Sequence, residues 1–161
     1  MQLKRFTDLG LRILMHLASA PDPARPLSIS ELAETLQWNQ NLVVKVAHFM
    51  VQAGWVTSVR GRSGGLLLAR DPKDYRLGDV VSALEGAEPL VDCETPPCPY
   101  AGRCGLVLAL SAAAEAFRAK LNESTLEDIR AAAPGKSAGP ALVATPRRGA
   151  PDDSSHSDEQ V

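Results

Sequence analysis

The beginning of the chain carries apolar side chains that recur every three or four residues, which is the spacing of one helix face. These positions are Phe6, Leu9, Ile13 and Leu17, with Gly10 and Leu14 beside them. The pattern predicts a helix that runs to about Ser19. A proline-rich stretch from residue 21 to residue 26 follows and ends it.

A capping signature opens the next predicted helix. In Ser28-Ile29-Ser30-Glu31 the serine hydroxyl can accept from a free amide of the first turn while the glutamate reaches back, so a short helix should extend to about Gln37. Residues 38–40 form a break, and a longer helix then continues until Gly54. The apolar positions predicted to share its buried face are Leu42, Val46, Phe49, Met50 and Ala53.

Two short segments typical of strands come next, at residues 55–59 and 66–69. They predict a hairpin with a long, glycine-rich tip. After the hairpin in the sequence, a further short helix is predicted, and it ends at Gly86. Its apolar positions are Leu77, Val80, Val81 and Leu84.

The pattern changes after this helix. No period is visible from residue 87 to 105, whereas an alanine-rich helix is predicted from Leu106 to Leu121. The capping signature Ser124-Thr125-Leu126-Glu127 predicts one more short helix. Residues 134–161 hold few large apolar side chains, so we expect a disordered tail there, because its ordering entropy would not be offset.

This order of elements predicts a mainly α fold with a small β wing. Residues 1–86 form a winged helix-turn-helix domain, and the longer helix has the size that fits the major groove of DNA. A cysteine loop follows over residues 87–105. The long helix and the short terminal helix occupy residues 106–133, ahead of the tail.

Composition and charge refine this expectation. Hydrophobic residues make up 45% of the 161 positions and charged residues 22%, enough for one compact domain with an appendage. The net charge of −2 hides an asymmetry, since residues 1–70 carry eight basic and four acidic side chains, which leaves −6 for the remainder. A basic half favours a polyanionic partner. No stretch approaches the roughly 18 apolar residues of a membrane span and no signal-peptide pattern is present, so we expect a cytoplasmic protein without membrane contact.

Two surfaces of the basic half carry groups that suit double-stranded DNA. The outer face of the longer helix is polar and mildly cationic, and the wing tip alternates arginine with glycine. The predicted DNA contacts are Ser28, Asn41, Lys45, His48, Gln52, Arg60, Arg62, Ser63 and Gly64. Ordinary solvent exposure is the alternative for either surface alone, and the two together, in this order, favour DNA binding.

All three cysteines of the chain, Cys93, Cys98 and Cys104, lie within twelve residues. An odd number of cysteines in a cytosolic protein argues against a disulfide framework. Thiolates separated by four and five residues can surround one metal or cluster, although the spacing matches neither zinc ribbons nor ferredoxins. The loop is therefore a candidate metal centre.

Three thiolates leave a fourth ligand position to fill. The candidates are water, an exogenous thiol or peptide, Asp8, His16 and His48. A single histidine on a helix is more often a surface or boundary residue than a ligand. Asp8 also has an ordinary role as a first-turn acid that complements the helix dipole.

The sequence does not have the patterns of an enzyme. It lacks a nucleophile elbow, a paired-acid arrangement and a phosphate-cradling glycine motif. A catalytic role for the cysteines would also leave the basic wing unexplained.

Four motifs taken together resemble the iron–sulfur winged-helix transcription repressors, over roughly residues 1–130. They are Lys4-Arg5-Phe6-Thr7-Asp8-Leu9-Gly10-Leu11-Arg12, the wing Val59-Arg60-Gly61-Arg62-Ser63-Gly64-Gly65, Leu77-Gly78-Asp79-Val80-Val81 with Leu84-Glu85-Gly86, and the Cys-x4-Cys-x5-Cys loop. The resemblance implies a homodimer in which Cys93, Cys98 and Cys104 hold an iron–sulfur cluster, [4Fe-4S] in preference to [2Fe-2S]. It further implies the partner subunit's Asp8 as a carboxylate ligand. The long helix would then be the dimerisation helix, with an intrachain core helix as its alternative.

Within this family the resemblance is to members that sense nitric oxide. Members that regulate cluster biogenesis carry a histidine three residues after the last cysteine, where this chain has Val107. The expected function is a repressor that binds operators of nitric oxide detoxification genes and releases them when the cluster is nitrosylated. The alternatives are a regulator of cluster biogenesis or of another stress regulon that uses a cluster, zinc or bare thiols as its switch.

Overall fold

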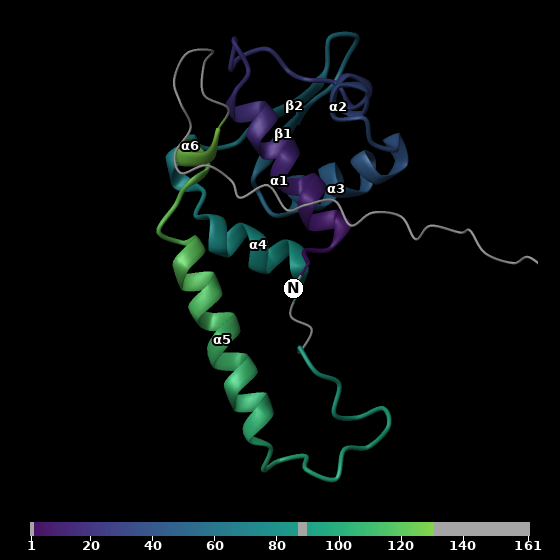
Figure 1. Cartoon of the computed structure of the whole chain (residues 1–161). Coiled ribbons are helices and arrows are strands. Elements are labelled where there is room, and N and C mark those ends of the chain that lie inside the picture. Colours follow the sequence, from purple (N-terminus) through teal and green to yellow (C-terminus); the bar gives the residue numbers. More distant parts are fainter. Residues whose placement is uncertain (1, 87–89, 131–161) are drawn as a thin grey trace, which may run out of the picture. The chain divides into compact units, whose positions relative to one another are not determined.

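The computed structural model describes residues 2–86 and 90–130. These residues form helices joined to one small antiparallel sheet of two strands (Figure 1), which confirms the predicted mainly α fold with a β hairpin. The elements are α1 (Arg5–Ala18), α2 (Ile29–Leu36), α3 (Gln40–Gln52), β1 (Val56–Val59), β2 (Gly65–Leu68), η1 (Pro72–Asp74), α4 (Leu77–Glu85), α5 (Gly105–Leu121) and α6 (Leu126–Ile129).

The core forms where α1, α2 and α3 pack together and against the hairpin. On α1 the predicted stripe is correct, and Leu9, Ile13 and Leu14 are almost fully buried. On α3 the prediction is wrong in part. The residues that are buried there are Val43, Val46, Ala47 and Met50.

The difference on α3 arises because other elements contact it from more than one side. Leu42 and Phe49 flank the buried stripe and are only partly buried. Phe49 still packs edge to face with Phe6 and Trp55, at ring centroid distances of 5.6 and 5.8 Å. The aromatic contacts therefore close the rim of the core and do not fill its centre.

Local capping fixes where the helices of the helix-turn-helix begin. The Ser28 hydroxyl accepts from the Glu31 amide at 3.2 Å, and the Ser28 amide donates to the Glu31 carboxylate at 2.8 Å. The predicted capping box of α2 is thus confirmed. Gln37 adopts a left-handed conformation after α2, and the Asn39 side chain caps α3 by accepting from the Asn41 amide at 2.9 Å.

The hairpin is extended by a single bridge to the segment before α2. β1 and β2 pair in antiparallel register from Val56 with Leu68 to Val59 with Gly65. Leu27 bridges Leu66 on the other side of β2, through hydrogen bonds of 3.1 and 2.8 Å. This bridge ties the hairpin to the start of α2.

The last short helix begins one residue later than the sequence predicts. Its capping box joins Thr125 and Asp128, whereas the sequence placed it at Ser124 and Glu127. The Ser124 carbonyl is instead used to accept from the Leu77 amide at 3.1 Å. Tertiary contact with α4 therefore decides the register of the cap.

All described residues belong to one compact unit. The predicted disordered tail lies outside the described residues. Among those described, no helix combines the length and the apolar character needed to cross a bilayer.

Candidate nucleic-acid interface and cysteine loop

The outer face of α3 is polar, as the sequence predicts. Asn41, Lys45, His48 and Gln52 are all exposed. Their exposure follows from the helix period, because the opposite side of α3 is committed to the core. The face thus offers one ammonium group together with amide and imidazole groups to a ligand outside the protein.

The hairpin turn presents Arg60, Arg62 and Ser63 to solvent. Within the described part of the chain neither arginine forms an ion pair. Gly61 has a φ of 114° and accepts a hydrogen bond from the Gly64 amide at 3.0 Å. A β-carbon on Gly64 would lie 2.3 Å from the Val59 carbonyl oxygen, so the tight turn requires glycine there.

Gly65 has a similar structural use. A β-carbon on it would lie 2.3 Å from the Leu27 carbonyl oxygen. Close contacts within this chain therefore explain both glycines. Gly64 remains a predicted DNA contact on its position alone.

A shallow groove joins the predicted surfaces. It runs between the start of α2, the exposed side of α3 and the hairpin, and Ser28, His48 and Gly64 line it. Its other lining residues include Val44, Val51 and Val59, which were not predicted from the sequence. The helical period of α3 could have revealed the first two, since both fall on the polar side of that helix.

The cysteine loop is built from successive turns. The Asp92 carboxylate accepts from the amides of Glu94 and Thr95 at 2.8 and 3.1 Å. The Cys98 amide donates to the Cys93 carbonyl at 3.0 Å. Cys104 is the N-cap residue of α5, so the loop leads directly into that helix.

The three thiols are free and partly exposed. Burial, and then the nearby thiols of Cys98 and Cys104, raise the pKa of Cys93. Three thiols from one loop form the soft donor set that iron–sulfur clusters and zinc take. By their chemistry these residues fit such a group.

The described residues do not form a finished metal centre by themselves. Across residues 2–86 and 90–130 there is no group of three or more His, Cys, Asp or Glu side chains arranged to hold a metal ion. Asp8 lies in the first turn of α1, where its carboxylate accepts from Arg12 Nε at 2.7 Å. The chain thus does not bring Asp8, His16 or His48 into a metal-holding group with the cysteines.

The carboxyl-terminal end of α5 is joined firmly to α4. Asn122 accepts from the Asp79 amide at 3.0 Å and donates to the Asp79 carboxylate at 2.9 Å. At Gly78 the two helices come so close that a β-carbon would lie 2.2 Å from the Arg118 carbonyl oxygen. This joint was not predicted from the sequence, where Gly78 within an apolar run was the available signal.

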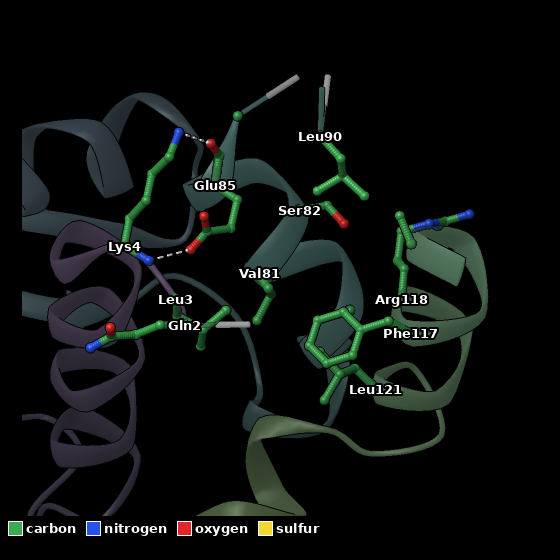
Figure 2. A pocket seen from close by; sticks show the side chains of 13 residues that line it. Gln2, Leu3, Lys4, Val81, Ser82, Glu85, Leu90, Phe117, Arg118 and Leu121 are labelled. Atoms are coloured by element: carbon green, nitrogen blue, oxygen red, sulfur yellow. Dashed lines mark hydrogen bonds between the residues drawn. The ribbon is translucent and has the colours of Figure 1, made fainter. Parts of the chain in front are cut away.

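Next to this joint lies a cavity of about 400 Å³ between α4, α5 and the N-terminal segment. Figure 2 shows Val81 and Ser82 of α4 on one side of it and Phe117 of α5 on the other. Lys4 borders it and donates through its backbone amide and its ammonium group to Glu85, at 2.8 and 2.7 Å. The segment before α1 is thus attached to the end of α4.

At the other end of α5 the contacts are few. Figure 1 shows the cysteine loop joined to the amino end of that helix, opposite to the end that contacts α4. None of the residues of α5 is buried. Leu106 and Leu108 are 58% and 73% exposed.

Comparison with known proteins identifies a family model and several solved structures that are similar to this chain. Residues 3–132 match the model of the Rrf2 family, which is described as an iron-dependent transcriptional regulator. The structure is similar to CymR (YrzC), the global cysteine regulator of B. subtilis, with a TM-score of 0.65 and 24% identity over 81% of this chain and 96% of that one.

Two further solved structures are similar. A Listeria innocua protein assigned as a transcriptional regulator is 26% identical, with a TM-score of 0.64 over 80% of this chain and 85% of that one. T. potens IscR is 24% identical, with a TM-score of 0.60 over 78% of this chain and 83% of that one.

Proposed function

Because the chain belongs to the Rrf2 family of iron-dependent transcriptional regulators, we propose that it is an iron–sulfur repressor of the NsrR type. Such a protein binds operators of nitric oxide detoxification genes and releases them when nitric oxide reaches its cluster. The family consists of transcription regulators, and the chain is not an enzyme.

The observation that carries the proposal is the place of the cysteines. Cys93, Cys98 and Cys104 lie in one loop at the amino end of α5. The other end of α5 is fixed to α4 through Asn122 and Gly78. A change at the loop therefore has a continuous helix through which it can act on the domain that we assign to DNA.

We assign DNA binding to α3 and the hairpin. As the recognition helix, α3 would enter the major groove. Arg60 and Arg62 of the hairpin would contact phosphates or the adjacent minor groove. The groups assigned to DNA are those predicted from the sequence: Ser28, Asn41, Lys45, His48, Gln52, Arg60, Arg62, Ser63 and Gly64.

A second copy of the chain would complete the site. The uncovered apolar side chains at the amino end of α5, Leu106 and Leu108, would pack against the partner, which makes α5 the dimerisation helix. The three cysteines would hold the cluster, [4Fe-4S] in preference to [2Fe-2S], with the partner subunit's Asp8 as the fourth ligand. In this proposal the domain boundaries are 1–86, 87–105, 106–133 and 134–161.

The choice of a nitric oxide sensor within the family rests on two positions. Val107 occupies the place of the histidine found in the regulators of cluster biogenesis, and Asp8 supplies a carboxylate in its stead. A carboxylate oxygen is a harder and weaker ligand for cluster iron than a thiolate. When bound, the cluster would thus supply an iron with a labile ligand that is open to nitric oxide.

An operator-binding titration with anaerobically purified protein tests the proposal. The protein with its cluster should bind a specific duplex tightly, and nitric oxide should abolish binding while it bleaches the visible absorbance. Binding that is insensitive to nitric oxide would contradict the sensing function.

A zinc or thiol redox switch on the same fold is the second candidate. The observation that favours it is that the three thiols are free and partly exposed, because such a donor set takes zinc or an oxidant as readily. Colourless protein that contains stoichiometric zinc after anaerobic purification would support this candidate instead.

A further inference from the structure

Val44 is an apolar side chain on the surface that we assign to DNA. It is 48% exposed, although it lies in the second turn of α3 among polar residues. On the helix surface its neighbours are Asn41, three residues before it, and His48, four residues after it. Both of these are exposed.

The hydrophobic core gives no reason for a valine at this position. The side of α3 that packs into the core is formed by Val43, Val46, Ala47 and Met50, and Val44 does not belong to it. Valine is also a poorer helix former than alanine or lysine, because its branched side chain loses rotamer freedom in a helix. The residue is therefore better explained by what α3 meets outside the chain.

The position of Val44 along α3 indicates that it contacts the edges of bases. In helix-turn-helix proteins the residues near the amino end of the recognition helix reach the bases. Val44 is four residues beyond Gln40, where α3 begins. Val51 lies seven residues later, about 10 Å along the helix axis, in the last turn.

The chemistry of the major groove then identifies the partner. Guanine, cytosine and adenine present hydrogen-bonding groups there, and these would lose water without gaining a partner if a valine covered them. Thymine presents a C5-methyl group, which is the apolar feature of the major-groove edges. Resting on the proposed function, we infer that Val44 is a specificity-determining residue that reads a thymine methyl group in the operator.

The test uses a duplex recovered by in vitro selection from random-sequence DNA with the full-length anaerobic protein. Each thymine of the duplex is replaced in turn by deoxyuridine, which pairs in the same way and lacks only the methyl group. At the thymine that Val44 contacts, the unmodified protein should lose about fourfold in affinity, the equivalent of the ~0.8 kcal/mol gained by burying one methylene-sized group.

The variant Val44→Ala separates this contact from all others. It should bind the thymine and deoxyuridine duplexes with equal affinity, because the side chain that senses the methyl group is gone. Since Val44 is exposed and alanine favours helix, the variant should fold as the original chain does. Val51→Ala is the matched control on the same helix, and it should keep the whole deoxyuridine penalty.

The outcomes distinguish this inference from the proposed function. If the duplex is bound specifically but no thymine shows a penalty that Val44→Ala removes, the inference is overturned and the proposed function stands. If the selection yields no specific duplex at all, both are overturned.

Discussion

The helix-turn-helix with its hairpin and the long helix α5 differ in how much of their apolar surface the chain itself covers. In the first region Leu9, Ile13, Leu32, Val43 and Met50 are buried, together with the base of the hairpin. Along the whole length of α5 no residue is buried. The core of the first region is thus covered within the chain itself, whereas α5 has surface that only another molecule would cover.

The two ends of α5 repeat this contrast on a smaller scale. Its carboxyl end is locked to α4 at Gly78 and Asn122, while its amino end carries Leu106, Leu108 and the cysteine loop in solvent. A sensor needs one end that is fixed to the output domain and one end that is free to respond. The contrast is the structural basis of the proposed function.

The largest expected effect comes from the core of the first region. Leu14→Ala should lower the free energy of unfolding by about 2–5 kcal/mol, because Leu14 is 1% exposed and its removal leaves a cavity. Leu108→Ala should change it by less than about 0.5 kcal/mol in the monomer, and should instead weaken dimerisation. Urea denaturation and sedimentation velocity measure the two quantities. Equal destabilisation of the monomer by both changes would remove the distinction between the regions.

The close contact between α4 and α5 can be tested by adding a single β-carbon at Gly78. Gly78→Ala should cost about 1–3 kcal/mol, because its β-carbon would collide with backbone and side-chain atoms of α5 and Asn122. Gly105→Ala, at the open end of α5, has no atom within 4 Å of the added carbon and should be neutral or stabilising by about 0.5 kcal/mol. Thermal unfolding of both variants provides the comparison. A harmless Gly78→Ala would mean that α5 is not held closely against α4.

The hairpin should act through charge. Arg62→Gln should remove one cation from the phosphate backbone and so reduce the slope of log affinity against log salt by about 1, which is roughly fivefold in affinity at 0.15 M salt. Lys120→Gln is the matched change on α5, where the lysine pairs with Glu123 at 2.7 Å, and it should leave the slope unchanged. Binding titrations at several salt concentrations measure both. An unchanged slope for Arg62→Gln would exclude that arginine from the interface.

The smallest expected effect is the acid sensitivity of the α2 cap. Hydrogen bonds from Ser28 and then from Arg25 lower the pKa of Glu31 to about 2. Because the folded-state pKa is lowered, the stabilisation is fully present above about pH 4.5 and is lost as the pH falls towards 2. Glu31→Gln should remove this part of the pH dependence of unfolding, whereas Glu34→Gln should retain it. Chemical denaturation between pH 2 and 5 would reveal either outcome.

The parts of the fold that could be predicted are those decided by local pattern. The stripe on α1, the Ser28 capping box and the hairpin follow from neighbouring residues alone, and each is found as predicted. The buried face of α3 and the cap before α6 were partly wrong, because partners distant in sequence decide both. Before α6, the Ser124 carbonyl accepts a hydrogen bond from the Leu77 amide, whereas the predicted cap would have used it within the first turn of the helix.

The candidate site divides in the same way. The exposure of Lys45, His48 and the wing arginines follows from helix period and turn chemistry, and the structure places them as expected. A ligand set that combines Asp8 with the cysteines would need a second subunit, and contacts between subunits leave no periodic pattern in a single sequence. Val44 was overlooked because a single valine on a polar face changes the hydrophobic pattern very little.

The most direct test of the account is the composition of the full-length protein after strictly anaerobic purification. Iron and acid-labile sulfide should be present in equal amounts, with visible absorbance that nitric oxide bleaches, and Cys98→Ser should contain neither while its winged-helix domain stays folded. Protein prepared in this way that holds no iron and no sulfide would contradict the central claim that the cysteine loop carries a cluster.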